Sequence, residues 1–505
     1  MPRFRALRDR MRDYNSLSRA AGLLDWDQEV CMPRGGGEAR ALQIGAVRRA
    51  AHEIIAADET GRLVEELAAA AAGAEPESED AALWRWTERQ YRRRRRQPAS
   101  LVEELASHCA RSQEVWVAAR AKRDFALFRP ELERMIELKR RQAEAVGSIA
   151  DPYDAWLEEY EPGMTTAGVR ALFAELKPGL VALVAEVAAR KDAARLPALA
   201  GSFPLERQRV FVEEVARAMG FDFERGRLDV SAHPFSASIS SDDVRLTTRY
   251  REDQPFSALF GVMHEAGHGL YEQGVGAELK HGPLCRGATM AAHESQSRLW
   301  ENLVGRGRGF WKRFLPRFAE LFPQAAAFDA EGIYGAVNRV ERSFIRVEAD
   351  ELTYGLHIML RFDLERDLLG ERVRAAELPE AWAAKSREYF GIVPPDDAQG
   401  VLQDVHWAGG LFGYFPTYAI GNLISVQLHE AALKARPDIP ARIEAGDFSG
   451  LLGWLRENVH RHGAKFGAEE LVRRATGSPI SAEPYLSYLR AKYGELYGLS
   501  SAGKP

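Results

Sequence analysis

Apolar residues recur at intervals of three and four along most of this 505-residue chain, which is the spacing that lets a helix bury one face. In the segment 100–128, for example, Leu101, Leu105 and Trp116 can share a face while charged residues lie elsewhere. Runs of alternating polarity, the mark of half-buried strands, are few. We therefore expect a mostly α-helical protein. Further helices are predicted at 130–149, 165–194, 206–220 and most of 255–380.

The segment 228–250 departs from this helical pattern. Two β-prone runs, FSASIS at 235–240 and VRLTTRY at 244–250, flank the turn-forming residues SDD. This arrangement predicts a β-hairpin, and therefore a small sheet, directly before the next helix.

The chain shows no internal repeat and no Pro/Gly/Ser linker long enough to divide it. We expect one large helical domain over 1–505, with two lobes flanking a deep cleft. The acidic loop GAEPESED at 73–80 is the softest segment predicted.

Composition excludes several classes of protein. Hydrophobic residues make up 46% and charged residues 28%, as in a folded globular chain, and the net charge of −5 does not suit a surface built for nucleic acid. The three cysteines include no CxxC pair, no apolar stretch could span a membrane, and the N-terminus lacks the apolar core of a secretion signal. We expect a cytoplasmic protein with neither nucleic-acid nor membrane partners, and we interpret the basic run 91–97, YRRRRRQ, as a solvated helix face.

The stretch GVMHEAGHGLYE at 261–272 carries the strongest chemical signal. On a helix, His264 and His268 lie one turn apart on the same face, so that both imidazoles can reach one ion. Glu265 projects about 100° away, close to the ion without having to bind it. Zinc hydrolases need this division, because two neutral imidazoles hold the metal while a free carboxylate takes a proton from water.

The surroundings of the motif favour a metal site over an ordinary pair of core histidines. Leu259, Val262, Met263 and Leu270 indicate a buried helix, in which three unpaired polar side chains would be costly. Tyr271 and Gly274 stand where metzincins have a glycine and a histidine, which excludes that class. A catalytic zinc site also needs a third protein ligand, and spacing alone leaves Glu294, His293, Glu301 and His281 as candidates.

Further motifs accompany HEAGH in a definite order along the chain: HPF at 233–235, DVRLT at 243–247, HEAGH at 264–268, HESQ at 293–296, IRVEAD at 345–350 and GVLQDVHW at 400–407. With this ordered set, the sequence resembles the carboxypeptidase Taq family of metallocarboxypeptidases, within the gluzincin class. The similarity extends over nearly the whole chain and includes the segments 23–43 and 153–165. One small departure is the glycine run in CMPRGGGEAR, near residue 35.

This resemblance implies Glu294 as the third ligand of one zinc ion per chain, with cobalt as an effective substitute. It implies a helical single-domain fold in which a helical region at about 1–200 covers the cleft and a catalytic core occupies about 201–505. It also implies a homodimer that removes single residues from peptides with a free C-terminus, with Glu265 as the general base.

An enzyme of this kind must bind the free C-terminal carboxylate, and a guanidinium suits that planar anion. Arg346 is our first candidate and Arg245 our second. A structural ion pair, with Asp350 or Asp243 respectively, is the alternative for each arginine.

Donors are also expected to face the scissile carbonyl as it gains negative charge. Related gluzincins resemble the arrangement of His406 followed by Tyr418, with Tyr414 as a rival for the tyrosine; packing is the alternative role for both aromatics. His233 resembles a family position near the substrate groove, and a turn histidine is the alternative reading.

Two other functions remain open from the sequence. A helical gluzincin oligopeptidase or dipeptidyl carboxypeptidase would share the same metal ligands. A non-catalytic helical scaffold would have lost its metal, although the intact set of His264, His268 and Glu294 argues against it.

Overall fold

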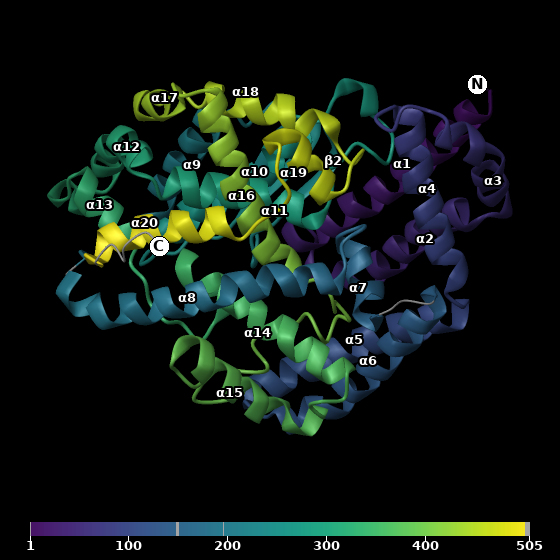
Figure 1. The fold of residues 1–505 in the computed structure, drawn as a ribbon, viewed down its shortest axis with the longest axis horizontal. Coiled ribbons are helices and arrows are strands. Elements are labelled where there is room, and N and C mark those ends of the chain that lie inside the picture. Colours follow the sequence, from purple (N-terminus) through teal and green to yellow (C-terminus); the bar gives the residue numbers. More distant parts are fainter. Residues whose placement is uncertain (1, 148–150, 195, 500–505) are drawn as a thin grey trace. The chain divides into compact units, whose positions relative to one another are not determined.

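The fold is mostly α-helical, as predicted, with one small sheet (Figure 1). It is seen in a computed structural model that describes residues 2–147, 151–194 and 196–499. Within those ranges no helix combines the length and the apolar character that crossing a membrane requires.

The chain forms two compact units, each assembled from three separate segments. The first comprises Met1–Arg95, Pro197–Val337 and Gln427–Pro479, and the second comprises Arg96–Leu196, Asn338–Val426 and Ile480–Pro505. The single domain, with a helical region at about 1–200 and a catalytic core at about 201–505, stays a prediction.

Helices of the first unit surround the sheet and the HEAGH stretch. At its N-terminal end, α1 to α4 pack their apolar faces together with residues 275–285, around Leu7, Met11 and Ile55. The elements are α1 (Pro2–Val30), α2 (Gly37–Ala56), α3 (Asp58–Ala72), α4 (Glu79–Arg96), α9 (Leu205–Met219), α10 (Pro255–Gln273), α11 (Met290–Arg298), the π-helix Leu299–Gly305, α12 (Arg308–Leu321), α13 (Ala330–Val337), α17 (Ile439–Ala445), α18 (Ser449–Asn458) and α19 (Ala468–Thr476).

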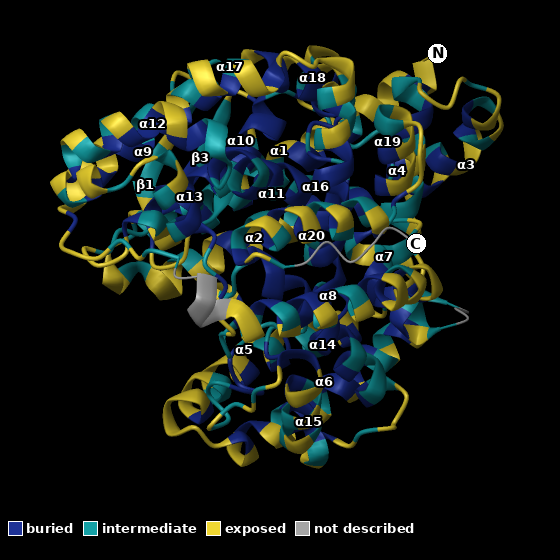
Figure 2. Ribbon diagram, turned by 60° about the vertical axis from the view of Figure 1, so that its left-hand side comes forward, coloured by how far each residue is buried: buried dark blue, intermediate teal, exposed yellow. Residues whose placement is uncertain are grey.

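The second unit is helical in all its longer elements. Its helix α14 is buried on every side over residues 351–362, including Leu356 and Leu360, so that this part of the helix has no exposed face (Figure 2). The elements are α5 (Ala99–Lys122), α6 (Phe125–Val146), α7 (Pro152–Tyr160), α8 (Thr166–Ala194), α14 (Glu351–Leu369), α15 (Leu378–Phe390) and α20 (Glu483–Tyr497). Helix α16 (Pro416–Ala435) passes from this unit into the first, and short 3-10 turns occur at Arg34–Gly36, Ala277–Leu279, Pro323–Ala327, Arg346–Glu348, Ala375–Glu377 and His460–His462.

The predicted hairpin is present and is part of a three-stranded sheet. Strands β2 (Ser236–Ser240) and β3 (Asp243–Thr248) are antiparallel, and β1 (Gly226–Val230) adds a parallel strand on the other side of β3. Val244 and Leu246 of β3 are fully buried, and β3 packs against α10. The sheet thereby supports the helix that carries HEAGH.

The basic run at 91–97 lies on the last turns of α4, where Arg92, Arg95 and Arg96 are exposed. Two of these arginines pair with carboxylates on the same surface, Arg92 with Glu88 and Arg95 with Asp58. The interpretation as a solvated helix face is therefore confirmed.

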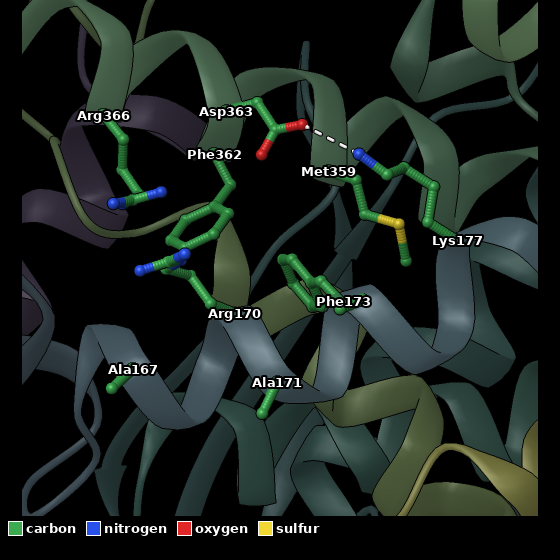
Figure 3. Close-up of a pocket in the computed structure, with 10 residues that line it drawn as sticks. Ala167, Arg170, Ala171, Phe173, Lys177, Met359, Phe362, Asp363 and Arg366 are labelled. Atoms are coloured by element: carbon green, nitrogen blue, oxygen red, sulfur yellow. Dashed lines mark hydrogen bonds and ion pairs between the residues drawn. The ribbon is translucent and has the colours of Figure 1, made fainter.

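A pocket of about 540 Å³ opens between α8 and α14 in the second unit (Figure 3). Its floor includes Phe173 and Phe362, and Lys177 pairs with Asp363 at its edge. None of the residues singled out by the sequence lines this pocket.

Candidate metal centre and active site

Three side chains of the first unit converge: the two histidines of HEAGH and one glutamate. His264 and His268 lie on α10, and Glu294 lies on α11. One donor atom from each falls within 4.8 Å of the others, and among the described residues this is the cluster with the makings of a metal site. Glu294 Oε2 is 3.6 Å from His264 Nε2 and 3.5 Å from His268 Nε2.

A glycine in the middle of HEAGH lets the two helices approach closely. A Cβ atom on Gly267 would lie only 2.6 Å from the carbonyl oxygen of Gln296 and 2.7 Å from Ser297 Cα. Helix α11 is held at its start by Thr289, whose hydroxyl accepts a hydrogen bond from Ala292 N at 3.2 Å. The close crossing brings Glu294 within reach of both histidines.

In both His264 and His268, ring atom Nδ1 contacts a residue outside the three converging donors. His264 Nδ1 lies 2.9 Å from Glu301 Oε2, and His268 Nδ1 lies 2.5 Å from His293 Nδ1. Both Nε2 atoms are thereby left on the side of Glu294. His293 and Glu301, two of the rival ligands, thus contact the far sides of the histidines instead of joining the three converging donors. His281, the third rival, is exposed on a loop.

Glu294 is itself held in place by its own helix. Arg298 Nε donates to Oε1 at 2.7 Å, and the Ser297 hydroxyl donates to Oε2 at 3.2 Å. The following π-helix carries Glu301 to His264, and Arg298 also lies 3.4 Å from Glu301 Oε2. A π-helical turn is rare and often occurs at functional sites.

Burial and charge shift the pKa values of this cluster. Burial lowers the pKa of His268 to about 4, so that it is neutral at pH 7. Burial would also lower the pKa of His264, but the Glu294 charge and the Glu301 hydrogen bond outweigh it and raise the pKa. Burial of Glu265 raises its pKa to about 7, and the pKa of Glu294 is held low against burial by Arg298 and the histidines.

The donor set fits a divalent metal ion of the zinc type. Four-coordinate zinc with bonds of about 2.1 Å places its ligand atoms about 3.4 Å apart. The two distances from Glu294 Oε2, 3.5 and 3.6 Å, match that separation. Two imidazole nitrogens with one carboxylate oxygen, leaving a position open, is the ligand set of catalytic zinc sites.

His406, Tyr414 and Tyr418 lie together in the second unit, in an aromatic cluster. The His406 ring is 5.7 Å from that of Tyr414 and 6.4 Å from that of Tyr418, and it stacks on Phe415 at 4.6 Å. Burial lowers the pKa of His406 to about 4 despite the nearby Asp404. The Arg346 guanidinium lies 5.2 Å from the centre of the Tyr418 ring.

Arg346 shares one carboxylate with a second buried arginine. Arg346 Nη2 is 2.8 Å from Asp404 Oδ1, and Arg361 Nε is 2.7 Å from Asp404 Oδ2. The ion pair of Arg346 is thus with Asp404 and not with Asp350, which instead caps α14 by accepting from Thr353 N. Two guanidinium groups on one carboxylate leave this buried trio with one positive charge.

Arg245 and His233 lie in the first unit, around the sheet. Arg245 forms a two-pronged ion pair with Asp243, with both contacts at 2.9 Å, and lies 4.2 Å from the Trp26 ring. The structural pairing suggested by the sequence for this arginine is therefore present. His233 is exposed in the loop between β1 and β2.

The chain matches the family model described as carboxypeptidase Taq (M32) metallopeptidase over residues 6–493. It belongs to this family. It is 42% identical to thermostable carboxypeptidase 1 of Thermus thermophilus over 95% of this chain and 96% of that protein, and 36% identical to carboxypeptidase 1 of Bacillus subtilis over 97% of each.

Solved structures agree with this assignment. The crystal structure of the M32 carboxypeptidase from Deinococcus radiodurans R1 superposes with a TM-score of 0.94 at 41% identity, over 99% of this chain and 100% of that one. Metallocarboxypeptidase 1 of Trypanosoma cruzi gives a TM-score of 0.94 at 33% identity, over 98% and 99%. The chain is therefore a metallocarboxypeptidase, a hydrolase with peptide substrates and a metal cofactor.

Sequence reasoning missed several supporting residues in each of the two units. Arg361 pairs with Asp404, although an arginine inside the apolar run LHIMLRF was a signal that it needed a buried partner. Arg298 had a local signal, because its partners Glu294 and Glu301 lie at i−4 and i+3. Glu272 gave none, because its partners Gly287 and His293 are brought near only by the fold.

Proposed function

We propose that this protein is a zinc-dependent carboxypeptidase that removes single amino acids from the C-terminus of peptides. The observation that carries this proposal is the convergence of His264, His268 and Glu294 within 4.8 Å, with Glu265 directly beside them on α10. His264, His268 and Glu294 hold one zinc ion per chain, and cobalt can replace it.

A zinc ion bound there would act as a Lewis acid, lowering the pKa of water to about 7 and polarising a carbonyl oxygen. Glu265 receives the proton of the attacking water on its carboxylate. It then gives that proton to the amine nitrogen of the departing residue. Burial suits it to this exchange, because its pKa is raised to about 7, close to that of the group it deprotonates.

His406 and Tyr418 donate hydrogen bonds to the oxygen of the scissile carbonyl as it becomes negative. Their support is the resemblance to other gluzincins and their common aromatic cluster, in which Tyr414 is the alternative donor. The lowered pKa of His406 makes the ring neutral at pH 7, so that it acts as a hydrogen-bond donor without a full charge.

Arg346 binds the free carboxylate of the peptide. The excess positive charge of Arg346, Arg361 and Asp404 supports this role, because a buried unbalanced cation favours an incoming anion. Arg245 is a weaker candidate, since its charge is already balanced by Asp243. His233, exposed beside the hairpin, is proposed only as a contact near the substrate groove.

The protein acts in the cytoplasm, which its three free cysteines support, and it forms a homodimer, which rests on the family resemblance. The rival function is that of an oligopeptidase or dipeptidyl carboxypeptidase, which the same metal ligands would serve. The third alternative, a metal-free scaffold, conflicts with the chain's membership of a metallopeptidase family.

Digestion of a defined peptide, followed over time by mass spectrometry, tests the proposal. Successive loss of single C-terminal residues is expected, with activity abolished by a chelator and restored by zinc. The same peptide with an amidated C-terminus should be cleaved about ten to a hundred times more slowly, the effect of losing a charge-assisted bond worth about 1.5–3 kcal/mol. Internal cuts, loss of dipeptides, or fewer than about 0.1 metal ions per purified chain would overturn it.

A further inference from the structure

The two histidines of the metal centre have different outer partners. His264 Nδ1 meets a carboxylate directly, at 2.9 Å from Glu301 Oε2. His268 Nδ1 instead meets another imidazole, at 2.5 Å from His293 Nδ1, and that imidazole meets a carboxylate through its other nitrogen, 2.8 Å from Glu272 Oε1. His268 is thus linked to the Glu272 carboxylate through the ring of His293.

The end of this chain of contacts fixes its direction. Glu272 Oε1 also accepts a hydrogen bond from Gly287 N at 2.9 Å. An ionised carboxylate only accepts hydrogen bonds, so His293 must donate to it from Nε2. In a neutral His293 ring, Nδ1 is then an acceptor, so that His268 carries its proton on Nδ1 and keeps a lone pair on Nε2, toward Glu294.

Glu272 is suited to be a fixed acceptor. Its side chain is only 5% exposed, and Arg19 lies 3.8 Å from Oε2. Burial by itself would raise its pKa, but the hydrogen bond from His293, the charge of Arg19 and the hydrogen bond from Gly287 outweigh burial and lower the pKa to about 2.

His293 is held tightly where it bridges the two groups. The ring of Tyr271 stacks on it at 5.5 Å with an interplanar angle of 29°. On another side, a Cβ atom at residue 287 would lie 2.4 Å from His293 Cδ2, so only glycine leaves room for the ring. The same glycine supplies the N–H that Glu272 accepts.

We infer that His293 and Glu272 are positioning residues that hold His268 in the tautomer able to bind the metal ion through Nε2. This inference rests on the proposed metal ligands. Outer partners of this kind typically change metal affinity by about ten- to a hundredfold. The HESQ motif thereby supplies both a ligand, Glu294, and the residue that orients another ligand.

Zinc affinity, measured by competition with a coloured chelator on the purified protein, tests this inference. His293→Leu should weaken zinc binding about ten- to a hundredfold. His293→Gln should recover much of that loss, because its amide oxygen can accept from His268 while its NH₂ donates to Glu272. His52→Leu, at an exposed histidine of α2, is the matched control and should bind zinc as the wild type does.

Glu272 provides an independent pair of variants in case the leucine at 293 prevents folding. Glu272→Leu should weaken zinc binding, while Glu272→Gln, whose amide oxygen still accepts from His293, should weaken it much less. Far-UV circular dichroism of the metal-free proteins shows which variants are folded. The visible spectrum of the cobalt-loaded proteins should change for His293→Leu and Glu272→Leu only.

Different results would contradict the proposed metal ligands and the positioning role of His293 and Glu272. If the wild type holds no zinc, or if His268→Leu binds it undiminished, the proposed ligands are wrong. If the wild type binds zinc and folded His293→Leu and Glu272→Leu bind it equally well, the positioning role is wrong. Equal weakening by His293→Leu and His293→Gln would assign His293 to packing alone and would also overturn the inference.

Discussion

Arg346 places two donors on a single oxygen of Asp404, with Nε at 3.0 Å and Nη2 at 2.8 Å. A third donor, Nη1, is 3.2 Å from the Tyr354 hydroxyl. This arginine is fixed before any ligand arrives, and the partner Arg361 keeps the trio positive. A preorganised, charged group of this kind is what recognition of a carboxylate requires.

Arg346→Lys should therefore raise KM for peptides with a free C-terminus about ten- to a hundredfold, because lysine keeps the charge but loses the planar fork. KM for the amidated peptide should change little. Arg245→Lys is the matched control and should leave both values near those of the wild type. If Arg245→Lys raises KM more than Arg346→Lys does, Arg245 and not Arg346 binds the substrate carboxylate.

Glu265→Gln should lower kcat about a hundred- to ten-thousandfold, since the amide cannot take a proton from water. Zinc content, measured by elemental analysis, should stay at the wild-type value because Glu265 is not among the three converging donors. Glu278→Gln, on the surface of the same unit, serves as control. Full activity in the Glu265 variant would remove it from the mechanism.

Tyr418→Phe and Tyr414→Phe differ by position alone and so compare two neighbouring hydroxyls, whose rings are 5.2 Å apart. Losing a donor to the developing oxyanion should reduce kcat about a hundred- to a thousandfold with little change in KM. We expect this result for Tyr418 and only a small effect for Tyr414. The opposite result would make Tyr414 the donor.

The burial of His460 leads us to expect that the protein loses stability in acid. It is fully buried, with Nε2 2.9 Å from Gln296 Oε1, and burial lowers its pKa from 6.5 to about 3. The unfolded chain therefore binds a proton below pH 6.5 that the folded protein refuses, so stability present above pH 6.5 is lost as the pH falls toward 3.

Replacing His460 by Phe should flatten this dependence. Between pH 7 and pH 5 the wild type should lose about 2 kcal/mol more unfolding free energy than the variant does. The variant is expected to be less stable at pH 7, because Gln296 loses its partner. Urea unfolding of both proteins at the two pH values measures the difference, and parallel losses would show that His460 does not contribute.

A buried ion pair fixes helix α20 to α14 in the second unit. Lys492 Nζ lies 2.6 Å from Glu351 Oε2, and both side chains are at most 6% exposed. Lys492→Met should cost about 3–5 kcal/mol of unfolding free energy, because it strands a buried carboxylate. Lys312→Met breaks the exposed pair with Glu444 and should cost less than about 1 kcal/mol.

Adding Glu351→Gln to the Lys492 variant should recover part of the loss, since no charge then remains buried. Thermal and urea unfolding of the single and double variants measures this. If the double variant is no more stable than Lys492→Met, packing and not charge accounts for the cost.

The parts of this structure that the sequence could predict depend on local spacing. The i and i+4 histidines need only a helix, and the hairpin needs only two runs and a turn, so both were predictable. Helices α8 and α9 begin and end within one residue of the predicted ranges for the same reason. Strand β1 was not predicted, because its parallel pairing with β3 involves residues about 18 positions away.

The features that the sequence could not predict are contacts that only the fold creates, such as which nitrogen of a histidine ring a neighbouring side chain meets. His293 and Glu301 have the spacing and chemistry of metal ligands, and only the crossing of α10 with α11 places them at Nδ1 instead of Nε2. Asp404 and Arg361 are 43 residues apart, and no local pattern joins them. The sequence could therefore identify the candidate metal ligands more readily than the residues that hold functional side chains in place.

Gly267 sets how far apart the ligands stand. Because the main chains of α10 and α11 touch there, the gap between the histidines and Glu294 is governed by a contact between two backbones, which yields less than a side-chain rotamer does. The smallest residue of HEAGH thereby helps to set the spacing of the three donor atoms, although it supplies none of them.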